Sequence, residues 1–203
     1  MKFTYSIPTK ILFGPGSFND LATTPLPGKK ALVVITAGKS MRANGYLDRL
    51  IDMLDKQGIG HALFDKILPN PVLRHVHEGA ALAREQGCDF VIGLGGGSSI
   101  DSAKSIAVMA KNPGDYWDYI SGGSGKGQPL VNGALPIVAI ATTAGTGTEA
   151  DPWTVITKED TNEKIGFGCS ETFPVLSVVD PEMMSSMPND ADHPGAPDRL
   201  SGL

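Results

Sequence analysis

The stretch DFVIGLGGGSSIDSAK, residues Asp89–Lys104, predicts a strand, a glycine turn and a helix in direct succession. Residues Phe90–Leu94 are almost all apolar, which is typical of a strand buried in a parallel sheet. A helix is predicted over Ile100–Lys111, with Ser98 or Ser99 as its N-cap. A helix N-terminus offers backbone N–H groups to an anion, and glycine allows a phosphate to approach the main chain closely. The stretch therefore predicts a phosphate-binding turn.

A second loop of similar character follows another predicted strand. The strand is Pro136–Ala141, and the loop is TTAGTGTE, residues Thr142–Glu149. Its threonines and glycines supply hydroxyl groups and open backbone for a phosphate, a ribose or a carboxamide. A glycine turn alone is a weak signal, and this one matches neither GxGxxG nor the P-loop pattern. Two such loops after two strands favour a nucleotide site over two ordinary turns.

Elsewhere the chain alternates short apolar runs with helical patterns. Buried strands are predicted at Ala31–Thr36, Gly60–Asp65 and Val175–Val179, and helices at Asn44–Gln57 and Val72–Gln86. A strand pair at the sheet edge is predicted within Phe3–Phe13. The alternation is typical of the α/β class, with a doubly wound, mostly parallel, Rossmann-like sheet. Ligands of such sheets bind beyond the carboxyl ends of the strands, where both loops lie.

Several other positions are candidates for ligand contacts, although ordinary structural roles explain each of them equally well. The turn after the first buried strand offers open backbone, a cation and a hydroxyl through Gly38, Lys39 and Ser40. Asn70 is held extended between two prolines, which suits a ligand-facing amide or a plain turn. Asp101 stands in the first turn of its helix, where the helix dipole alone would explain an acid.

Composition and charge exclude several classes of function. Of the 203 residues, 41% are hydrophobic and 19% charged, as in a soluble globular domain. A net charge of −5 gives no basis for binding nucleic acid or membranes, and neither a membrane-length apolar run nor a signal peptide is found. Cys88 and Cys169 fit no zinc or disulfide spacing, which indicates reduced thiols in a cytoplasmic protein. His75 and His77, two positions apart on a predicted helix, are expected at the surface.

Four motifs resemble those of the iron-containing (group III) alcohol dehydrogenases, and in particular their butanol-dehydrogenase branch. They are GGGSSIDSAK at 95–104, TTAGTGTE at 142–149, PNP at 69–71 and VDPE at 179–182. The resemblance extends over about residues 3–188. It implies a dinucleotide-binding domain like the N-terminal domain of dehydroquinate synthase, followed by a helical domain that carries Fe²⁺ or Zn²⁺. It also implies hydride transfer between NAD(P)H and a small alcohol or aldehyde.

The resemblance assigns cofactor contacts to both loops. The pyrophosphate would be held at the glycine turn by Gly96, Gly97 and Ser98. The cofactor channel would be lined by three threonines of the second loop, Thr142, Thr143 and Thr146. Asp101 would lie nearer the nicotinamide, and Lys164 would lie beside the ribose.

The turn after the first buried strand bears on the choice between NAD and NADP. Members of the family that prefer NAD tend to place an acid there, to bind the hydroxyl groups of the adenosine ribose. Residues Thr36–Ser40 contain no acid. A carboxylate would repel a 2′-phosphate, whereas Lys39 could pair with it. We therefore predict NADP, with NAD as the alternative.

The sequence departs from the family's pattern after Pro188. Family members continue into a helix of the form GxDAxxxH, which supplies the first metal ligands. Here Asp198 falls near the register of that Asp, but Gly202 stands where the His is expected, and two prolines interrupt the helix. We expect residues 1–188 to form the cofactor domain and residues 189–203 a disordered, aberrant tail of a truncated or frameshifted chain. Asp198 is the one candidate metal ligand, and no catalytic residue is assigned.

The expected function is the cofactor-binding half of an NAD(P)-dependent alcohol/aldehyde oxidoreductase. The alternative is a dinucleotide-binding or interaction domain without catalysis. A runner-up enzyme class is the glycerol dehydrogenase or dehydroquinate synthase type, whose motifs match less well. Without the helical domain and its metal, the face that this domain covers would be exposed and apolar, which favours self-association.

Overall fold

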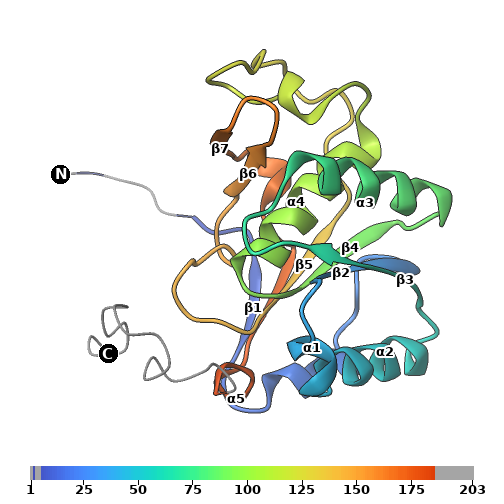
Figure 1. Cartoon of the computed structure of the whole chain (residues 1–203). Coiled ribbons are helices and arrows are strands. Elements are labelled where there is room, and N and C mark those ends of the chain that lie inside the picture. Colours follow the sequence, from blue (N-terminus) through green and yellow to red (C-terminus); the bar gives the residue numbers. More distant parts are fainter. Residues whose placement is uncertain (1, 3–5, 186–203) are drawn as a thin grey trace.

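Six parallel strands form the sheet on which the rest of the chain is built (Figure 1). The computed structural model describes residue 2 and residues 6–185. Its central strands are β2 (Lys30–Thr36), β4 (Phe90–Gly95), β5 (Ile137–Ala141) and β8 (Leu176–Val179). The edge strands are β1 (Lys10–Phe13) and β3 (Gly60–Ile67), and the order is β1-β8-β5-β4-β2-β3.

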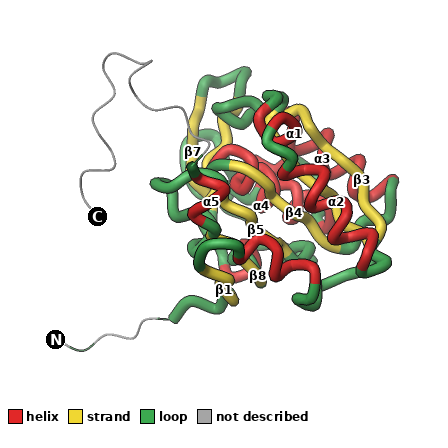
Figure 2. Tube along the Cα trace, turned by 90° about the horizontal axis from the view of Figure 1, so that it is seen from below, coloured by secondary structure: helices red, strands yellow, loops and turns green. Residues whose placement is uncertain are grey.

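Helices cover both faces of this sheet (Figures 1 and 2). One face carries the 3₁₀ helix η1 (Ser17–Ala22) with α1 (Ser40–Ala43) and α2 (Tyr46–Lys56). The opposite face carries α3 (Leu73–Glu85) and α4 (Gly97–Lys111). The remaining elements are η2 (Tyr116–Asp118), the antiparallel pair β6 (Thr154–Lys158) and β7 (Glu163–Phe167), η3 (Ser170–Thr172) and α5 (Pro181–Met184). The predicted doubly wound α/β architecture is confirmed.

Strand β2 shows why the sheet is covered on both sides. Its interior residues are all apolar and buried, and successive side chains point to opposite faces. Val33 and Ile35 belong to the core under α2, whereas Leu32 and Val34 belong to the core under α3 and α4. A strand with apolar side chains on both faces is stable only between two helical layers, which the alternating pattern predicts.

Helix α4 packs directly on strand β4 because Gly93 leaves room for it. A Cβ atom on Gly93 would lie 2.9 Å from the Cα atom of Ile100 and 3.0 Å from the Cβ atom of Ala103. The close contact places the N-terminus of α4 immediately beyond the carboxyl end of β4.

Three predictions about these elements need correction. The edge strand is shorter than predicted, and β1 pairs in parallel with β8 instead of forming a local strand pair. Neither Ser98 nor Ser99 is the N-cap of α4: the helix begins at Gly97, and Gly96 is the cap residue. His75 is buried, with its ring edge-on to the ring of Phe64.

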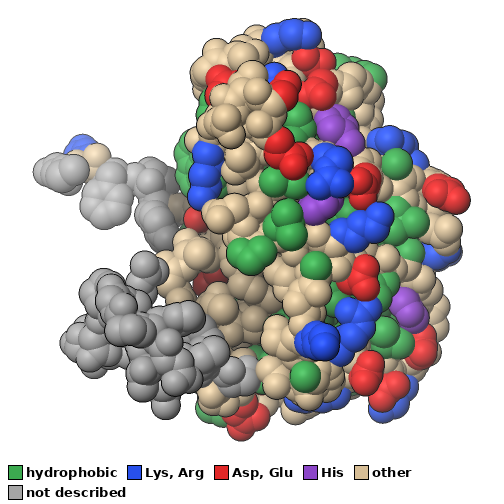
Figure 3. Space-filling model, viewed as in Figure 1, with side chains coloured by type: hydrophobic (Ala, Val, Ile, Leu, Met, Phe, Trp, Pro, Cys, Tyr) green, Lys and Arg blue, Asp and Glu red, His purple; other side chains and the backbone are tan. Residues whose placement is uncertain are grey.

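The surface of the described part carries charges of both signs. On the face shown in Figure 3, acidic and basic side chains alternate, and no large area of one sign is visible. Among the described residues, no helix is both long and apolar enough to cross a bilayer. The predicted tail, residues 189–203, lies outside the described residues, as does Asp198.

Candidate functional site

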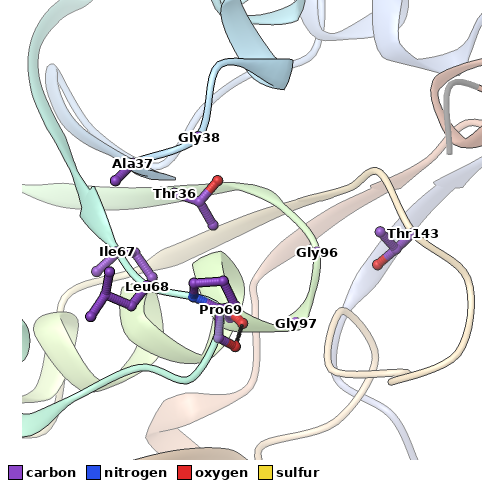
Figure 4. A pocket seen from close by; sticks show the side chains of 10 residues that line it. Thr36, Ala37, Gly38, Ile67, Leu68, Pro69, Gly96, Gly97 and Thr143 are labelled. Atoms are coloured by element: carbon purple, nitrogen blue, oxygen red, sulfur yellow. Dashed lines mark hydrogen bonds between the residues drawn. The ribbon is translucent and has the colours of Figure 1, made fainter. Parts of the chain in front are cut away.

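A cavity of about 370 Å³ opens at the carboxyl ends of the strands. It is lined by Thr36, Ala37, Gly38, Ile67, Leu68, Pro69, Gly96, Gly97, Ser98 and Thr143 (Figure 4). The chain passes from β2 outward to β3 and then returns to β4 on the other side of β2, so the sheet reverses its order between β2 and β4. The loops that follow β2 and β4 both line the cavity. Such a reversal point is where open α/β sheets bind their ligands.

The glycine turn forms the floor of this cavity. Gly95 has a φ of +141°, a conformation that strongly favours glycine, and Gly96 caps α4. Gly97 and Ser98 occupy the first turn of α4, where backbone N–H groups lack partners within the helix. The turn therefore offers hydrogen-bond donors and the positive end of the dipole of a 15-residue helix to an anion.

The threonine loop lies directly against the glycine turn. The N–H of Thr142 donates to the carbonyl of Gly95 at 3.0 Å. A Cβ atom on Gly96 would lie 2.9 Å from Oγ1 of Thr143, and one on Gly97 would lie 2.8 Å from Cγ2 of Thr146. The absence of side chains at Gly96 and Gly97 is thus what allows the two loops to approach. The structure brings together the two loops that the sequence singles out.

The proline-flanked turn is tied to the same site. The hydroxyl of Ser98 donates to the carbonyl of Pro69, which links the start of α4 to this turn (Figure 4). The ammonium of Lys164, on β7, donates to Oδ1 of Asn70 at 3.1 Å. Asn70 and Lys164 are therefore neighbours beside the cavity wall that Pro69 forms.

The other candidate residues lie around the cavity without lining it. Lys39 is the residue before α1 and Ser40 its first residue, directly after the cavity-lining Gly38. Thr142 is buried at the end of β5. The carboxylate of Asp101 accepts hydrogen bonds from the hydroxyl of Thr148 at 2.7 Å and from the N–H of Val155 at 3.0 Å. Asp101 thus faces the end of the threonine loop and the start of β6.

A buried lysine is the main feature that sequence reasoning missed. Lys104 lies on α4 one turn after Asp101 and has no exposed surface. Burial lowers the pKa of the Lys104 ammonium, and burial also raises the pKa of the Asp101 carboxyl, against the opposing effect of the hydrogen bond from Thr148. The signal available in the sequence was the spacing of three between the two charges, which stand among otherwise small and apolar residues at 97–110.

No metal site is formed by the described residues. Among residues 2 and 6–185, no three His, Cys, Asp or Glu side chains come close enough together to hold an ion. The side chains present at the cavity do not fit a metal, whereas the glycine floor and the helix N-terminus fit a phosphate.

Comparisons with known proteins agree with this geometry. The family profile of iron-containing alcohol dehydrogenases matches residues 8–181. NADH-dependent butanol dehydrogenase B of Clostridium acetobutylicum is 35% identical over 201 residues, which are 99% of this chain and 50% of that protein. Choline dehydrogenase of Bacillus subtilis is 39% identical over 187 residues, which are 91% of this chain and 46% of that protein.

Solved structures show the same relationship. The alcohol dehydrogenase of an archaeal halo-thermophile from a Red Sea brine pool superposes with a TM-score of 0.85 at 37% identity, over 93% of this chain and 48% of that one. NADH-dependent butanol dehydrogenase A of Thermotoga maritima gives a TM-score of 0.84 at 35% identity, over 92% and 46%. The chain spans about half the length of the relatives it matches. It belongs to the iron-containing alcohol dehydrogenase family.

Proposed function

We propose that this chain binds a nicotinamide dinucleotide as the cofactor-binding half of an alcohol/aldehyde oxidoreductase. The observation that carries the proposal is the contact between the glycine turn and the threonine loop at the N-terminus of α4. Two glycine-containing loops that meet at one helix N-terminus suit a diphosphate, because a diphosphate needs several backbone N–H donors at close range. Relatives that match 99% and 92% of the chain are named as NADH-dependent butanol dehydrogenases, which supports the same proposal.

Different residues of the site would contact different parts of the cofactor. The diphosphate would accept hydrogen bonds from the backbone of Gly96, Gly97 and Ser98 at the start of α4. The hydroxyl groups of Thr143 and Thr146 lie next to those glycines and would orient the adjoining ribose or nicotinamide. The Asn70–Lys164 pair adjoins Pro69, which accepts a hydrogen bond from Ser98, and would bind a ribose. Roles for Thr142 and Asp101 on the nicotinamide side stay predictions.

The reaction itself needs groups that the described residues do not supply. A bound dinucleotide would provide or accept the hydride, while this domain would orient it and hold its charge. Because the described residues form no metal site, polarisation of the alcohol oxygen is not assigned to them. The second candidate function is a dinucleotide-binding domain without catalysis. Reduction of butanal by NADPH, with and without added Fe²⁺ or Zn²⁺, separates the two: turnover supports the first, and binding without turnover supports the second.

A fluorescence titration tests dinucleotide binding, which both candidate functions require. The emission of reduced nicotinamide should increase on adding the chain, with saturation at a dissociation constant of about 1–100 μM. A proposal of dinucleotide binding is wrong if neither NADPH nor NADH gives a saturable change.

The same titration tests the choice of cofactor. We propose that NADPH binds more tightly than NADH, by about tenfold, because residues 36–40 bring a lysine and no carboxylate to the turn beside the cavity. A Cβ atom on Gly38 would meet only Oγ1 of Thr36, at 3.7 Å, so Gly38→Asp has room for its side chain. Gly38→Asp should lower the affinity for NADPH and favour NADH, while Lys39→Gln should reduce the preference. Tighter NADH binding by the wild-type chain would align it with the relatives named as NADH-dependent and contradict the proposal.

We also propose that the chain self-associates through the β1 edge of the sheet. Phe13 is 76% exposed, and Ile11 on β1 and Val175 beside it are also exposed. An open edge strand with apolar side chains favours association. Sedimentation should show a concentration-dependent dimer or larger species that Phe13→Asp shifts toward the monomer. Val131→Asp is the matched control, since the exposed fraction of Val131, 72%, is close to that of Phe13, but Val131 does not belong to β1. Identical sedimentation of the wild-type chain and Phe13→Asp would contradict this proposal.

A cytoplasmic location is also proposed. It is supported by Cys88 and Cys169, both free thiols.

A further inference from the structure

Lys104 is a charged side chain that is completely enclosed by protein. Its exposed fraction is 0%, and it lies two turns into α4, the helix whose first turn forms the floor of the cavity. Burying an ammonium group is strongly unfavourable unless hydrogen bonds and opposite charge compensate for the lost water. The location of its partners therefore indicates what the lysine holds in place.

All the hydrogen-bond partners of the Lys104 ammonium come from one short segment. It donates to Oγ1 of Thr148 at 2.7 Å, to the carbonyl of Asp151 at 2.8 Å and to the carbonyl of Trp153 at 2.8 Å. The carboxylate of Asp151 lies 3.2 Å away and supplies opposite charge. Thr148 is the last residue but one of the TTAGTGTE loop. Lys104 thus fastens the exit of the threonine loop to α4.

Thr148 connects the lysine to Asp101 through its hydroxyl group. This hydroxyl accepts from Lys104 and donates to Oδ1 of Asp101 at 2.7 Å. The carbonyl of Trp153, at 3.2 Å, is a second and longer acceptor for this hydroxyl, so the shorter bond to the charged Asp101 carboxylate is the stronger one. Asp101 and Lys104 lie one turn apart on α4, so the loop exit is fixed to two successive turns of the same helix.

The threonine loop is consequently held at both ends. At its start, the N–H of Thr142 donates to the carbonyl of Gly95. At its exit, Thr148 is held by Lys104 and Asp101. Between these anchors lie Thr143 and Thr146, the two side chains that approach Gly96 and Gly97. The distance between the loop and the start of α4 is therefore set partly by the buried lysine.

We propose that Lys104 is a positioning residue for dinucleotide binding. It holds the threonine loop at the distance from the start of α4 that a bound diphosphate requires. The proposal rests on the proposed function, because it concerns the same cleft. Lys104 does not line the cavity and would not touch the cofactor; it would act on the threonine loop through Thr148. Loss of its ammonium would remove the hydrogen bonds from Lys104 to the loop exit and loosen it, although the hydroxyl of Thr148 would still donate to Asp101 and that of Ser177 to the carbonyl of Glu149.

The test compares four variants of the full chain by fluorescence titration with NADPH, at a temperature at which circular dichroism shows them folded. Lys104→Met removes the ammonium and Thr148→Val removes the connecting hydroxyl, and we expect their dissociation constants to rise by about tenfold and about fivefold. Thr148→Ser keeps the hydroxyl and should stay within about twofold of the wild-type value. Leu50→Ala opens a cavity in the core on the opposite face of the sheet, so it lowers stability without touching the loop, and it should also keep the wild-type value.

Each outcome decides the question. If the wild-type chain does not bind NADPH, the proposed function itself fails. If the wild-type chain binds and Lys104→Met binds equally well, the positioning role is wrong. It is also wrong if Leu50→Ala weakens binding as much as Lys104→Met, because general destabilisation then explains both. Should Lys104→Met not fold, the comparison of Thr148→Val with Thr148→Ser decides: weaker binding by the valine variant alone supports the role, and equal binding overturns it.

Discussion

Replacing Gly97 by valine should weaken dinucleotide binding by about 100-fold or more, while the chain still folds. Gly97 is the first residue of α4 and lines the cavity. A Cβ atom there would lie 2.8 Å from Cγ2 and 3.2 Å from Oγ1 of Thr146, so the threonine loop would have to move away. The branched side chain would also occupy the space beside the backbone N–H groups that a diphosphate needs. Isothermal titration calorimetry with NADPH measures the loss.

The control for this variant is Gly166→Val. Gly166 is exposed on β7, and a Cβ atom there would meet only the carbonyl of Thr154, at 3.9 Å. This variant adds the same side chain far from the clash and should keep the wild-type dissociation constant. If Gly97→Val binds NADPH within about threefold of the wild-type chain, the diphosphate does not lie at the start of α4.

Gly93→Ala should lower the free energy of unfolding by about 2–3 kcal/mol. The new methyl group would lie 2.9 Å from the Cα atom of Ile100 and 3.0 Å from the Cβ atom of Ala103. Both neighbours belong to the packed helix α4, so relief requires a shift of the helix relative to β4 instead of a side-chain rotation. Urea unfolding of the two chains gives the difference in the free energy of unfolding.

Gly166→Ala is again the matched control, because its methyl group meets no close neighbour. Its free energy of unfolding should change by less than about 0.5 kcal/mol. A Gly93→Ala variant as stable as this control would show that α4 is free to move on β4, and that the glycine is not required for the close packing.

The sheet was largely predictable because its strands carry a strong and simple signal. Strand β2 is apolar at every interior position, which only a strand covered on both faces would require. Loops with glycine and threonine at the ends of β4 and β5 then predicted the site, since parallel strands end at the same edge of a sheet. The convergence of Gly96 with Thr143 follows from this topology.

Features that depend on contacts between residues far apart in the sequence could not be predicted in this way. His75, two positions from His77 on its helix, was expected at the surface, but the packing of α3 against β3 encloses its ring. The hydroxyl of Ser98 was expected to cap its own helix, but it donates to Pro69, 29 residues earlier. The spacing of three residues indicates that Asp101 and Lys104 lie on one side of α4, but it contains no information about Thr148, 44 residues beyond Lys104, which joins them.

The most direct measurement follows the backbone amide signals of the ¹⁵N-labelled chain during titration with NADPH. We expect the largest shifts to fall together on residues 96–98 and on residues 143–146, in the two loops that meet at the start of α4. Smaller shifts are expected at Gly38 and Asn70. Shifts confined to one loop, or centred on a different face of the sheet, would contradict a diphosphate held between them.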